Sequence, residues 1–280
     1  MEVITNPSQM QNLMLSLKKQ GKKIGFVPTM GYLHEGHLSL IRCSKKENDI
    51  TVVSIFVNPI QFGVNEDFGR YPRDFERDKS LCEKENVDYI FYPSYEEMYP
   101  DGFQTYVEVT ELSKGLCGDF RPGHFKGVAT VVAKLFNIVC PDNAYFGKKD
   151  FQQLKVIQRM VKDLNFPVNV VGCPVVREPD GLAMSSRNKY LSDEERESAL
   201  YISQALFEAK RMFEDGITDP NLIKERVKQI ISQANHLKEI QYVEIVDSNT
   251  LKPVDKVKKS DVLAVAVYIG NTRLIDNIEF

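Results

Sequence analysis

The sequence lacks the features that mark several classes of protein. Its five cysteines, Cys43, Cys82, Cys117, Cys140 and Cys173, are at least 23 positions apart, so it contains no CxxC pair. This spacing disfavours a zinc cage and a disulfide framework, and it fits a reducing cytosol. No stretch approaches the roughly 18 apolar residues of a membrane span, and no basic leader precedes an apolar run. We therefore expect a cytoplasmic protein that is neither exported nor inserted into a membrane.

An excess of positive charge is also missing. Lys and Arg number 36 against 39 Asp and Glu, which leaves a formal net charge of −3. A nucleic-acid binder usually carries a basic surface, so this balance argues against a nucleic-acid partner. No internal repeat or low-complexity tract is present, and 280 residues with 42% hydrophobic content are enough for a sizeable core. The length suggests about two domains at roughly 150 residues each.

Short apolar runs alternate with helical patterns over the first 175 or so residues. Runs rich in β-branched and aromatic residues indicate buried strands of a parallel sheet, and they lie at 24–29, 51–57, 89–92 and 168–176. Apolar residues at helical spacing follow Asn6 and Pro7, and recur at about 37–48, 74–86, 126–139 and 150–164. This alternation is typical of a doubly wound, Rossmann-like α/β domain.

A different architecture begins near residue 177. The segment 192–195 has the form of a capping box, and Asp219 followed by Pro220 opens a second helix. Three strand-like runs then follow, the last two joined by a hairpin at 270–272, at 240–246, 262–269 and 273–280. We expect a Rossmann-like domain over 1–176 and a smaller C-terminal α+β domain with an antiparallel sheet over 177–280, which covers the active site.

The segment TMGYLHEGH, at 29–37, lies where the first predicted strand ends and a helix begins. Ligands bind at this point in open α/β sheets. His34 and His37 are three positions apart, so their side chains can point the same way, and Gly36 removes a side chain where backbone approaches a ligand. The helix N-terminus favours an anion. The pattern predicts a phosphate cradle; the alternatives are a plain helix cap with two surface histidines, or a zinc site that would still need a third ligand.

Six ordered segments carry a resemblance to a known family. The HxGH element resembles the nucleotidyltransferase superfamily, which includes the class I aminoacyl-tRNA synthetases. The longer run PTMGYLHEGHLSLI is similar to the pantoate:β-alanine ligase family, the pantothenate synthetases. The resemblance continues through VNPIQF (57–62), YPR (71–73), RPGHFKGVATVV (121–132), FGKKDFQQ (146–153) and REPDGLAMSSRN (177–188).

The resemblance implies an activity. Members of this family use ATP to join pantoate to β-alanine: the carboxylate attacks the α-phosphorus, pyrophosphate leaves, and the amine displaces AMP from the pantoyl adenylate. ATP, pantoate and β-alanine are then the small-molecule partners, Mg²⁺ accompanies ATP, and a homodimer is expected.

Roles for individual residues follow from the matching motifs. The resemblance gives catalytic roles to His37, His34, Lys149 and Arg187, with both histidines bonded to the phosphates and His37 as a proton donor. We expect His37 instead to stabilise charge in the transition state, because attack of a carboxylate on phosphorus needs no proton. The ATP-binding positions that it implies are Met30, Gly31, His34, Gly36, His37, Gly147, Lys148, Lys149, Asp150, Val176, Met184, Ser185, Ser186 and Arg187. The segment 184–187 resembles the mobile KMSKS loop of class I synthetases.

The remaining implied roles concern the acid and the metal. Pantoate contacts are expected from Met30, Asn58, Gln61 and Gln153, and Gln61 also borders the β-alanine position. Amide groups suit hydroxyl and carboxylate oxygens without adding fixed charge. Asp78 is the expected magnesium ligand, although Arg77 beside it departs from the acid-rich run of the family. Arg121, His124 and Lys126 are expected to support the site.

Other interpretations of these motifs stay open. Taken alone, the amides of 57–62 fit ordinary loop hydrogen bonding, KKD at 148–150 fits a solvated helix start, and SSRN at 185–188 fits a polar linker. An adenylyltransferase acting on a phosphorylated acceptor would share the HxGH element. A nucleotide sensor or a tRNA-binding module would share it as well, although the net charge opposes RNA binding.

Overall fold

The computed structural model describes residues 1–64 and 66–280, which form two compact units. The first unit contains 1–113, 121–148 and 153–174, and the second contains 114–120, 149–152 and 175–280. Over the described ranges, no helix combines the length and the apolar character of a membrane span.

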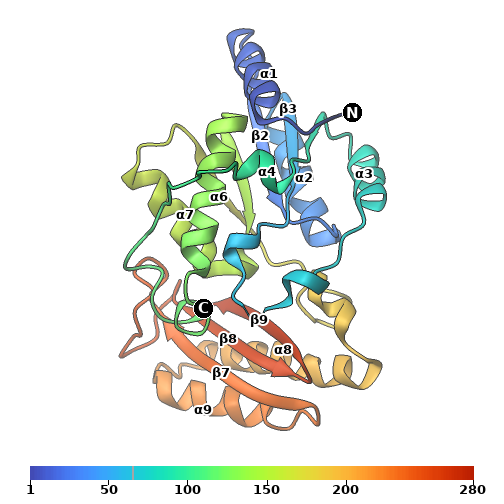
Figure 1. Cartoon of the computed structure of the whole chain (residues 1–280). Helices are drawn as coiled ribbons and strands as arrows, with labels where there is room; N and C mark the ends of the chain where they lie inside the picture. The colour runs from blue at the N-terminus through green and yellow to red at the C-terminus, as the bar shows by residue number, and fades with distance from the viewer. Residues whose placement is uncertain (65) are drawn as a thin grey trace. The chain divides into compact units, whose positions relative to one another are not determined.

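A six-stranded parallel sheet forms the centre of the first unit. Its strand order is β1-β4-β3-β2-β5-β6. The strands are β1 (Glu2–Ile4), β2 (Ile24–Thr29), β3 (Ile50–Ile55), β4 (Tyr89–Phe91), β5 (Asn143–Gly147) and β6 (Asn169–Cys173). The helices are α1 (Pro7–Lys19), α2 (Glu35–Glu47), α3 (Phe75–Lys84), α4 (Tyr95–Met98), α6 (His124–Val139) and α7 (Phe151–Asp163), with short 3₁₀ turns η1 (Pro59–Gln61), η2 (Asp67–Arg70) and η3 (Lys148–Asp150). These elements run from blue to yellow-green in Figure 1.

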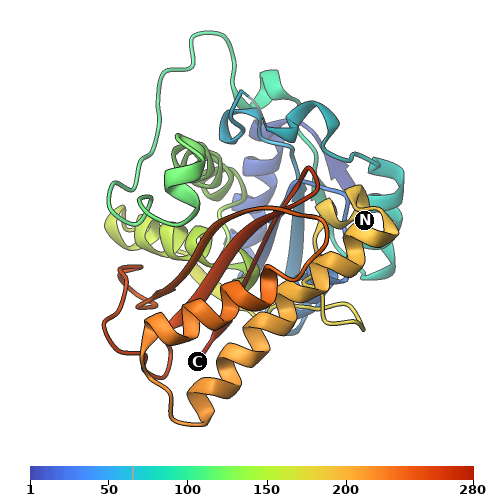
Figure 2. The same ribbon diagram turned by 90° about the horizontal axis from the view of Figure 1, so that it is seen from below.

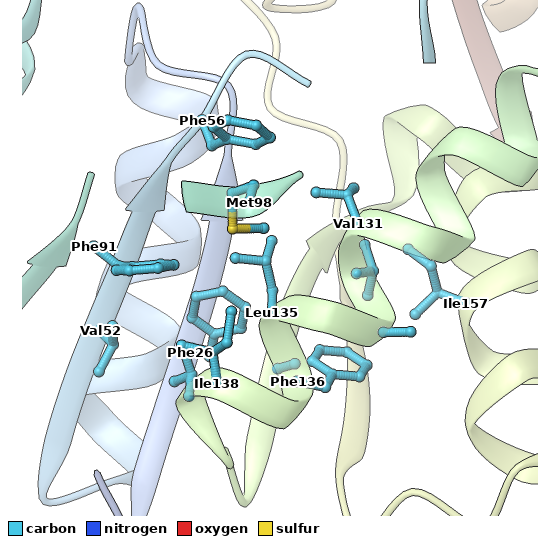
Figure 3. Close-up of a cluster of buried hydrophobic side chains, with 14 of the residues drawn as sticks. Phe26, Val52, Phe56, Phe91, Met98, Val131, Leu135, Phe136, Ile138 and Ile157 are labelled. Atoms are coloured by element: carbon cyan, nitrogen blue, oxygen red, sulfur yellow. The ribbon is translucent and has the colours of Figure 1, made fainter. Parts of the chain in front are cut away.

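Successive side chains of each strand point to opposite faces of the sheet, and helices cover both faces. Phe26 of β2 packs in the cluster that includes α1, α6 and α7, whereas the next residue, Val27, packs in the cluster that includes α2 and α3. Figure 3 shows the first cluster, in which Phe26, Val52 and Phe91 of three neighbouring strands lie beside Leu135 of α6. Burial of both faces explains why these strands are continuous apolar runs. The predicted Rossmann-like fold is confirmed.

The order of the strands sets where a ligand can bind. From β2 the chain builds outward through β3 and β4, then returns to add β5 on the other side of β2. The strands β2 and β5 are parallel neighbours, with Gly25 opposite Asn143. Their carboxyl ends therefore meet at the point where the strand order reverses, which is where open α/β sheets bind ligands.

The second unit contains a three-stranded antiparallel sheet covered by two helices. The strands β7 (Leu237–Val246), β8 (Val262–Ile269) and β9 (Thr272–Glu279) lie in that order, and a two-residue turn joins β8 to β9. The helices α8 (Asp193–Glu214) and α9 (Pro220–Ile231) lie along this sheet in Figure 2. Their buried residues form one hydrophobic cluster with those of the strands. The unit also holds α5 (Cys117–Phe120) and the 3₁₀ turn η4 (Ser186–Tyr190). The predicted antiparallel sheet is confirmed.

Capping residues in the sequence predicted the starts of three helices correctly, whereas the end of one strand was predicted wrongly. The side chains of Asn6, Ser192 and Asp219 cap α1, α8 and α9 as predicted. The strand predicted over 168–176 ends at Cys173, because Pro174 has no N–H to donate to a sheet. The prediction that Val176 ends this strand was therefore wrong.

Candidate active site

The loop between β2 and α2 carries the histidine pair. Gly31 and Tyr32 both have positive φ, at 80° and 51°, so the chain reverses direction directly after β2. His34 is the N-cap of α2, and its backbone N–H donates to Nδ1 of His37 at 3.3 Å. The two rings lie 4.1 Å apart between centroids. His34 is thus the cap of α2, and its hydrogen bond to His37 holds the two rings together at the start of the helix.

The hydrogen bond to Nδ1 fixes the tautomer of His37. A nitrogen that accepts an N–H cannot itself carry the proton, so the proton of the neutral ring lies on Nε2. Nε2–H is then a donor, and it belongs to a residue in the first turn of α2. An Nε2–H donor and the helix N-terminus together suit a phosphate oxygen.

A buried hydrogen-bond network follows β3 and orients the amide of Gln61. The Nδ2 group of Asn58 donates to Oε1 of Gln61 at 3.0 Å and to the carbonyl of Gly127 at 3.2 Å. The hydroxyl of Tyr99 donates to Oδ1 of Asn58 at 2.9 Å. Asn58 has only 1% of its surface exposed, so both its donors and its oxygen are engaged inside the protein. This geometry favours a supporting role for Asn58 over the predicted direct contact with pantoate.

The same network leaves the amide nitrogen of Gln61 facing the loop after β2. Since Oε1 of Gln61 accepts from Asn58, the Nε2 group must point the other way, and it lies 3.2 Å from the sulfur of Met30. Thioether sulfur is a weak acceptor. A carboxylate or hydroxyl oxygen of an acid would be a stronger partner for this amide.

Tyr99 was missed by the sequence analysis. It lies 41 positions after Asn58 and follows α4, a helix of four residues that is too short for a periodic signal. Burial raises the pKa of the Tyr99 phenol well above its ordinary value. The hydroxyl therefore stays protonated and remains a donor to Asn58.

The residues predicted to support the site divide into two groups. Arg121 pairs with Glu66 and lies 3.0 Å from Nε2 of His124, whose Nδ1 lies 2.8 Å from the carbonyl oxygen of Gln61. Burial raises the pKa of Glu66, the hydrogen bonds and charge of Arg121 lower it more, and the resulting pKa is below the ordinary value. Lys126 is exposed and pairs with Glu108 instead. His124 therefore contacts the backbone of η1 and Arg121 contacts His124, whereas the charge of Lys126 pairs with Glu108.

Gly127 allows α6 to approach η1 very closely. A Cβ atom at this position would lie 2.5 Å from the carbonyl oxygen of Ile60 and 2.7 Å from Cα of Gln61. Both are backbone atoms, which cannot swing aside as a side chain can. The motif RPGHFKG was recognised, but no local pattern marks this glycine as the contact that sets the position of Gln61.

The carboxyl end of β5 supplies the predicted GKKD segment, which the two units share. Gly147 ends β5 and Lys148 follows it, both in the first unit, and Gln153 lies in the same unit, in the first turn of α7. Lys149 and Asp150 belong to the second unit. Their predicted roles in ATP binding therefore stay predictions.

The predicted KMSKS-like segment is closely held within the second unit. Arg177 makes a two-point ion pair with Asp276 of β9, at 2.6 and 3.1 Å. The backbone N–H of Met184 donates to the carbonyl of Val176 at 3.0 Å, and the hydroxyl of Ser185 accepts from the N–H of Arg187. Residues 176–187 thus form a narrow loop that the Arg177–Asp276 ion pair attaches to β9. Ser185, Ser186 and Arg187 lie at the end of this loop. Their contacts with ATP remain predicted.

Asp78 does not lie in an acidic cage. Both of its oxygens accept backbone N–H groups, and burial raises the pKa of its carboxyl while these hydrogen bonds oppose the rise. Among the described residues, no group of three or more His, Cys, Asp or Glu side chains is arranged to hold a metal ion.

Comparison with known proteins identifies close relatives. A model of the family described as pantoate-beta-alanine ligase matches residues 2–279. The sequence is 97% identical over 280 residues, 100% of both chains, to the pantothenate synthetase of Sulfurihydrogenibium sp. strain YO3AOP1. The crystal structure of pantothenate synthetase from Thermus thermophilus is similar with a TM-score of 0.94 and 45% identity, covering 100% of this chain and 99% of that one. The pantoate-beta-alanine ligase of Francisella tularensis, solved with beta-gamma ATP and beta-alanine, gives 0.82 and 38%, covering 100% and 97%.

Proposed function

The chain belongs to the pantoate–β-alanine ligase family and is a ligase, and we propose that it makes pantothenate through a pantoyl-adenylate intermediate. In the first half-reaction the carboxylate of (R)-pantoate attacks the α-phosphorus of ATP and pyrophosphate leaves. In the second, the amine of β-alanine attacks the activated carbonyl and AMP leaves. Neither step needs a nucleophile from the protein, so the work of the site is positioning and charge stabilisation.

One contact carries the proposal. The amide nitrogen of Gln61, after β3, lies 3.2 Å from the sulfur of Met30, which directly follows β2 and leads to the histidine pair. An acid held by this amide would have its carboxylate next to the loop that presents His34 and His37. The acid pocket and the phosphate cradle are thereby adjacent within one rigidly packed unit.

The histidines, lysines and amides have distinct roles in this proposal. Nε2–H of His37 donates to phosphate oxygens as charge shifts onto them, and Lys148 adds a cation from the turn after β5. Lys149, Asp150, Val176 and the 184–187 segment contribute to ATP binding, Gln153 helps to hold pantoate, and Gln61 also borders β-alanine. When bound, Mg²⁺ would neutralise phosphate charge.

The acceptor pocket distinguishes this function from adenylyl transfer to a phosphorylated acceptor. A phosphate on the acceptor would call for arginine, which binds it through two parallel hydrogen bonds. The side chains at the end of β3 are instead neutral amides, and Arg121 is paired with Glu66. Neutral amides of this kind fit the hydroxyl and carboxylate oxygens of a hydroxy acid.

We also propose a cytoplasmic homodimer. All five cysteines, which lie in the described part of the chain, are free thiols, as is usual in a reducing compartment. The dimer is proposed from the family resemblance alone. Light scattering coupled to size exclusion would test it, and a monomer at micromolar concentration would disprove it.

The proposed function is tested by ATP–pyrophosphate exchange with Mg²⁺, first with pantoate and without any amine. Exchange that depends on pantoate is expected, and Gln61→Ala should raise the KM for pantoate far more than that for ATP. Gln158→Ala is a matched control, because it removes a partly buried amide of α7 that donates to the carbonyl of Val170. Absence of exchange with every acid tested would favour the adenylyltransferase. Equal damage to pantoate and ATP use would show that the pocket is misassigned.

A further inference from the structure

The carboxylate of Asp78 reaches from the first turn of α3 to the loop that precedes the histidine pair. The backbone N–H of Tyr32 donates to Oδ2 at 2.6 Å, and that of Leu33 donates to Oδ1 at 2.7 Å. The loop and the carboxylate are 46 and 45 positions apart in the sequence. Each carboxylate oxygen therefore accepts one of two successive backbone N–H groups, directly before His34.

The loop needs such an anchor because its backbone conformation is unfavourable. Tyr32 has φ of 51°, in the left-handed region that residues with a side chain rarely adopt. A Cβ at Gly31 would lie 3.0 Å from both Oδ2 of Asp78 and Cγ2 of Ile55, so only glycine fits without adjustment. Strain of this kind persists only where surrounding contacts hold it. The two short hydrogen bonds that Asp78 accepts hold Tyr32 and Leu33 in this conformation.

The charge of Asp78 is already balanced within the protein. Its side chain is 1% exposed, and Nη1 of Arg77 lies 3.4 Å from Oδ1. The same guanidinium stacks 4.8 Å from the ring centroid of Tyr32. A cation at this distance opposes the approach of a second cation, and both oxygens of the carboxylate already accept backbone N–H groups.

From this geometry we propose that Asp78 is a positioning residue for the reaction and not a magnesium ligand. It fixes the Gly31–Leu33 turn, and through the turn it fixes the backbone N–H of His34 that sets the tautomer of His37. The donor that meets the phosphates is thereby held in place before ATP binds. This inference rests on the proposed function, because it assigns the site to ATP.

The test compares Asp78→Asn with Asp74→Asn. The amide at 78 keeps the shape of the carboxylate but offers one oxygen, so one backbone N–H would face an NH₂ group. Asp74, which caps α3 by accepting the N–H of Arg77 at 3.2 Å, also carries a carboxylate on this helix. Asn is an equally good cap, so Asp74→Asn removes a neighbouring charge and spares the loop.

Pantoate-dependent exchange is measured for both variants across a range of Mg²⁺ concentrations. We expect Asp78→Asn to lower kcat about 10- to 100-fold, as displacements near 1 Å do, while the half-saturating Mg²⁺ concentration stays within about twofold of wild type. Asp74→Asn should match wild type. A rise of about tenfold or more in half-saturating Mg²⁺, with kcat restored at high Mg²⁺, would overturn the inference, as would wild-type kinetics for Asp78→Asn.

Two further measurements keep the inference testable. If Asp78→Asn fails to fold, Arg77→Leu removes the stacking on Tyr32 at an exposed position, and a smaller fall in kcat with unchanged Mg²⁺ dependence is expected. Hydrogen exchange of the backbone N–H groups of residues 32 and 33, without any substrate, should be faster in Asp78→Asn and unchanged in Asp74→Asn. Unchanged exchange in Asp78→Asn would refute the anchor. Loss of pantoate-dependent exchange in the wild type would instead refute the proposed function alone.

Discussion

Gly127→Ala should displace the acid pocket without touching any substrate. The added Cβ would lie 2.5 Å from the carbonyl oxygen of Ile60 and 2.7 Å from Cα of Gln61. A relaxed contact of carbon with such atoms needs about 3.4 Å, so α6 and η1 must separate by roughly 0.7–0.9 Å. The neighbours are backbone atoms on both sides, and the shift therefore falls on η1 as a whole and carries the amide of Gln61 with it.

The size of the effect follows from that shift. Overpacking of a tight contact costs about 1–3 kcal/mol of stability. A misplacement near 1 Å in a substrate-positioning group costs on the order of 100-fold in rate. We expect Gly127→Ala to lower kcat/KM for pantoate by about 10- to 100-fold and to change the KM for ATP much less, since the histidine loop is anchored separately by Asp78.

The assay is pantoate-dependent pyrophosphate exchange together with thermal unfolding. Gly69→Ala is the control, because a Cβ at Gly69 meets nothing within 4 Å and the residue has no positive φ. That variant should keep wild-type kinetics and be neutral or slightly more stable. If Gly127→Ala had the stability and kinetics of Gly69→Ala, the close approach of α6 would not control the pocket.

Three further changes probe the histidine, the amide network and the pair behind η1. His37→Ala should lower turnover by about 100- to 1,000-fold, since one preorganised donor to developing charge is worth that much; near wild-type exchange in a folded variant would remove its role. Tyr99→Phe leaves a buried amide oxygen without its donor, at about 1–3 kcal/mol, and should lower Tm and raise the KM for pantoate. Tyr145→Phe removes another buried hydroxyl, far along the sequence from the amide network, and should lower Tm without changing the KM for pantoate. The same rise in KM in both variants would show that the hydrogen bond from Tyr99 to Asn58 does not orient Gln61. Glu66→Gln should lower Tm at pH 7 because Glu66 pairs with Arg121. The pKa of Glu66 in the folded protein lies below its ordinary 4.5. The difference in Tm between wild type and Glu66→Gln should therefore have its full size above pH 4.5 and should vanish as pH falls through the folded pKa. A difference in Tm that did not change with pH would show that the charge of Glu66 is not its cause.

The parts of the fold that the sequence predicted are those with local causes. A capping side chain or a proline at the first helical position acts within one turn, so α1, α8 and α9 could be placed from Asn6, Ser192 and Asp219. Strands buried on both faces appear as apolar runs, which located β2 and β3. The strand β1 has three residues and carries no periodic signal.

The candidate site was predicted by motif, and its internal support was not. Asn58 and the carbonyl of Gly127 are 69 positions apart, and Tyr99 lies 41 positions from Asn58. No window of sequence contains both partners of such contacts. Asn58 is expected to touch pantoate because its amide is the right chemistry, whereas its burial and its hydrogen bond to Gln61, known only from the fold, favour a supporting role. The hydrogen bonds that Asp78 accepts likewise join residues that are 46 and 45 positions apart in the sequence.

The arrangement of charge suggests why the acid pocket is built from neutral groups. In the proposed reaction the carboxylate of pantoate gives up negative charge as it attacks phosphorus, so a cation bound to it would stabilise the ground state more than the transition state and slow the step. A neutral amide such as that of Gln61 orients the acid and leaves its nucleophilicity intact. Negative charge grows instead on the phosphate oxygens, for which the first unit offers Nε2–H of His37, a helix N-terminus and Lys148, which directly follows β5. Neutral amides after β3 and a histidine donor after β2 suit an acid-activating site, and β2 and β3 are parallel neighbours whose carboxyl ends lie at the same edge of the sheet.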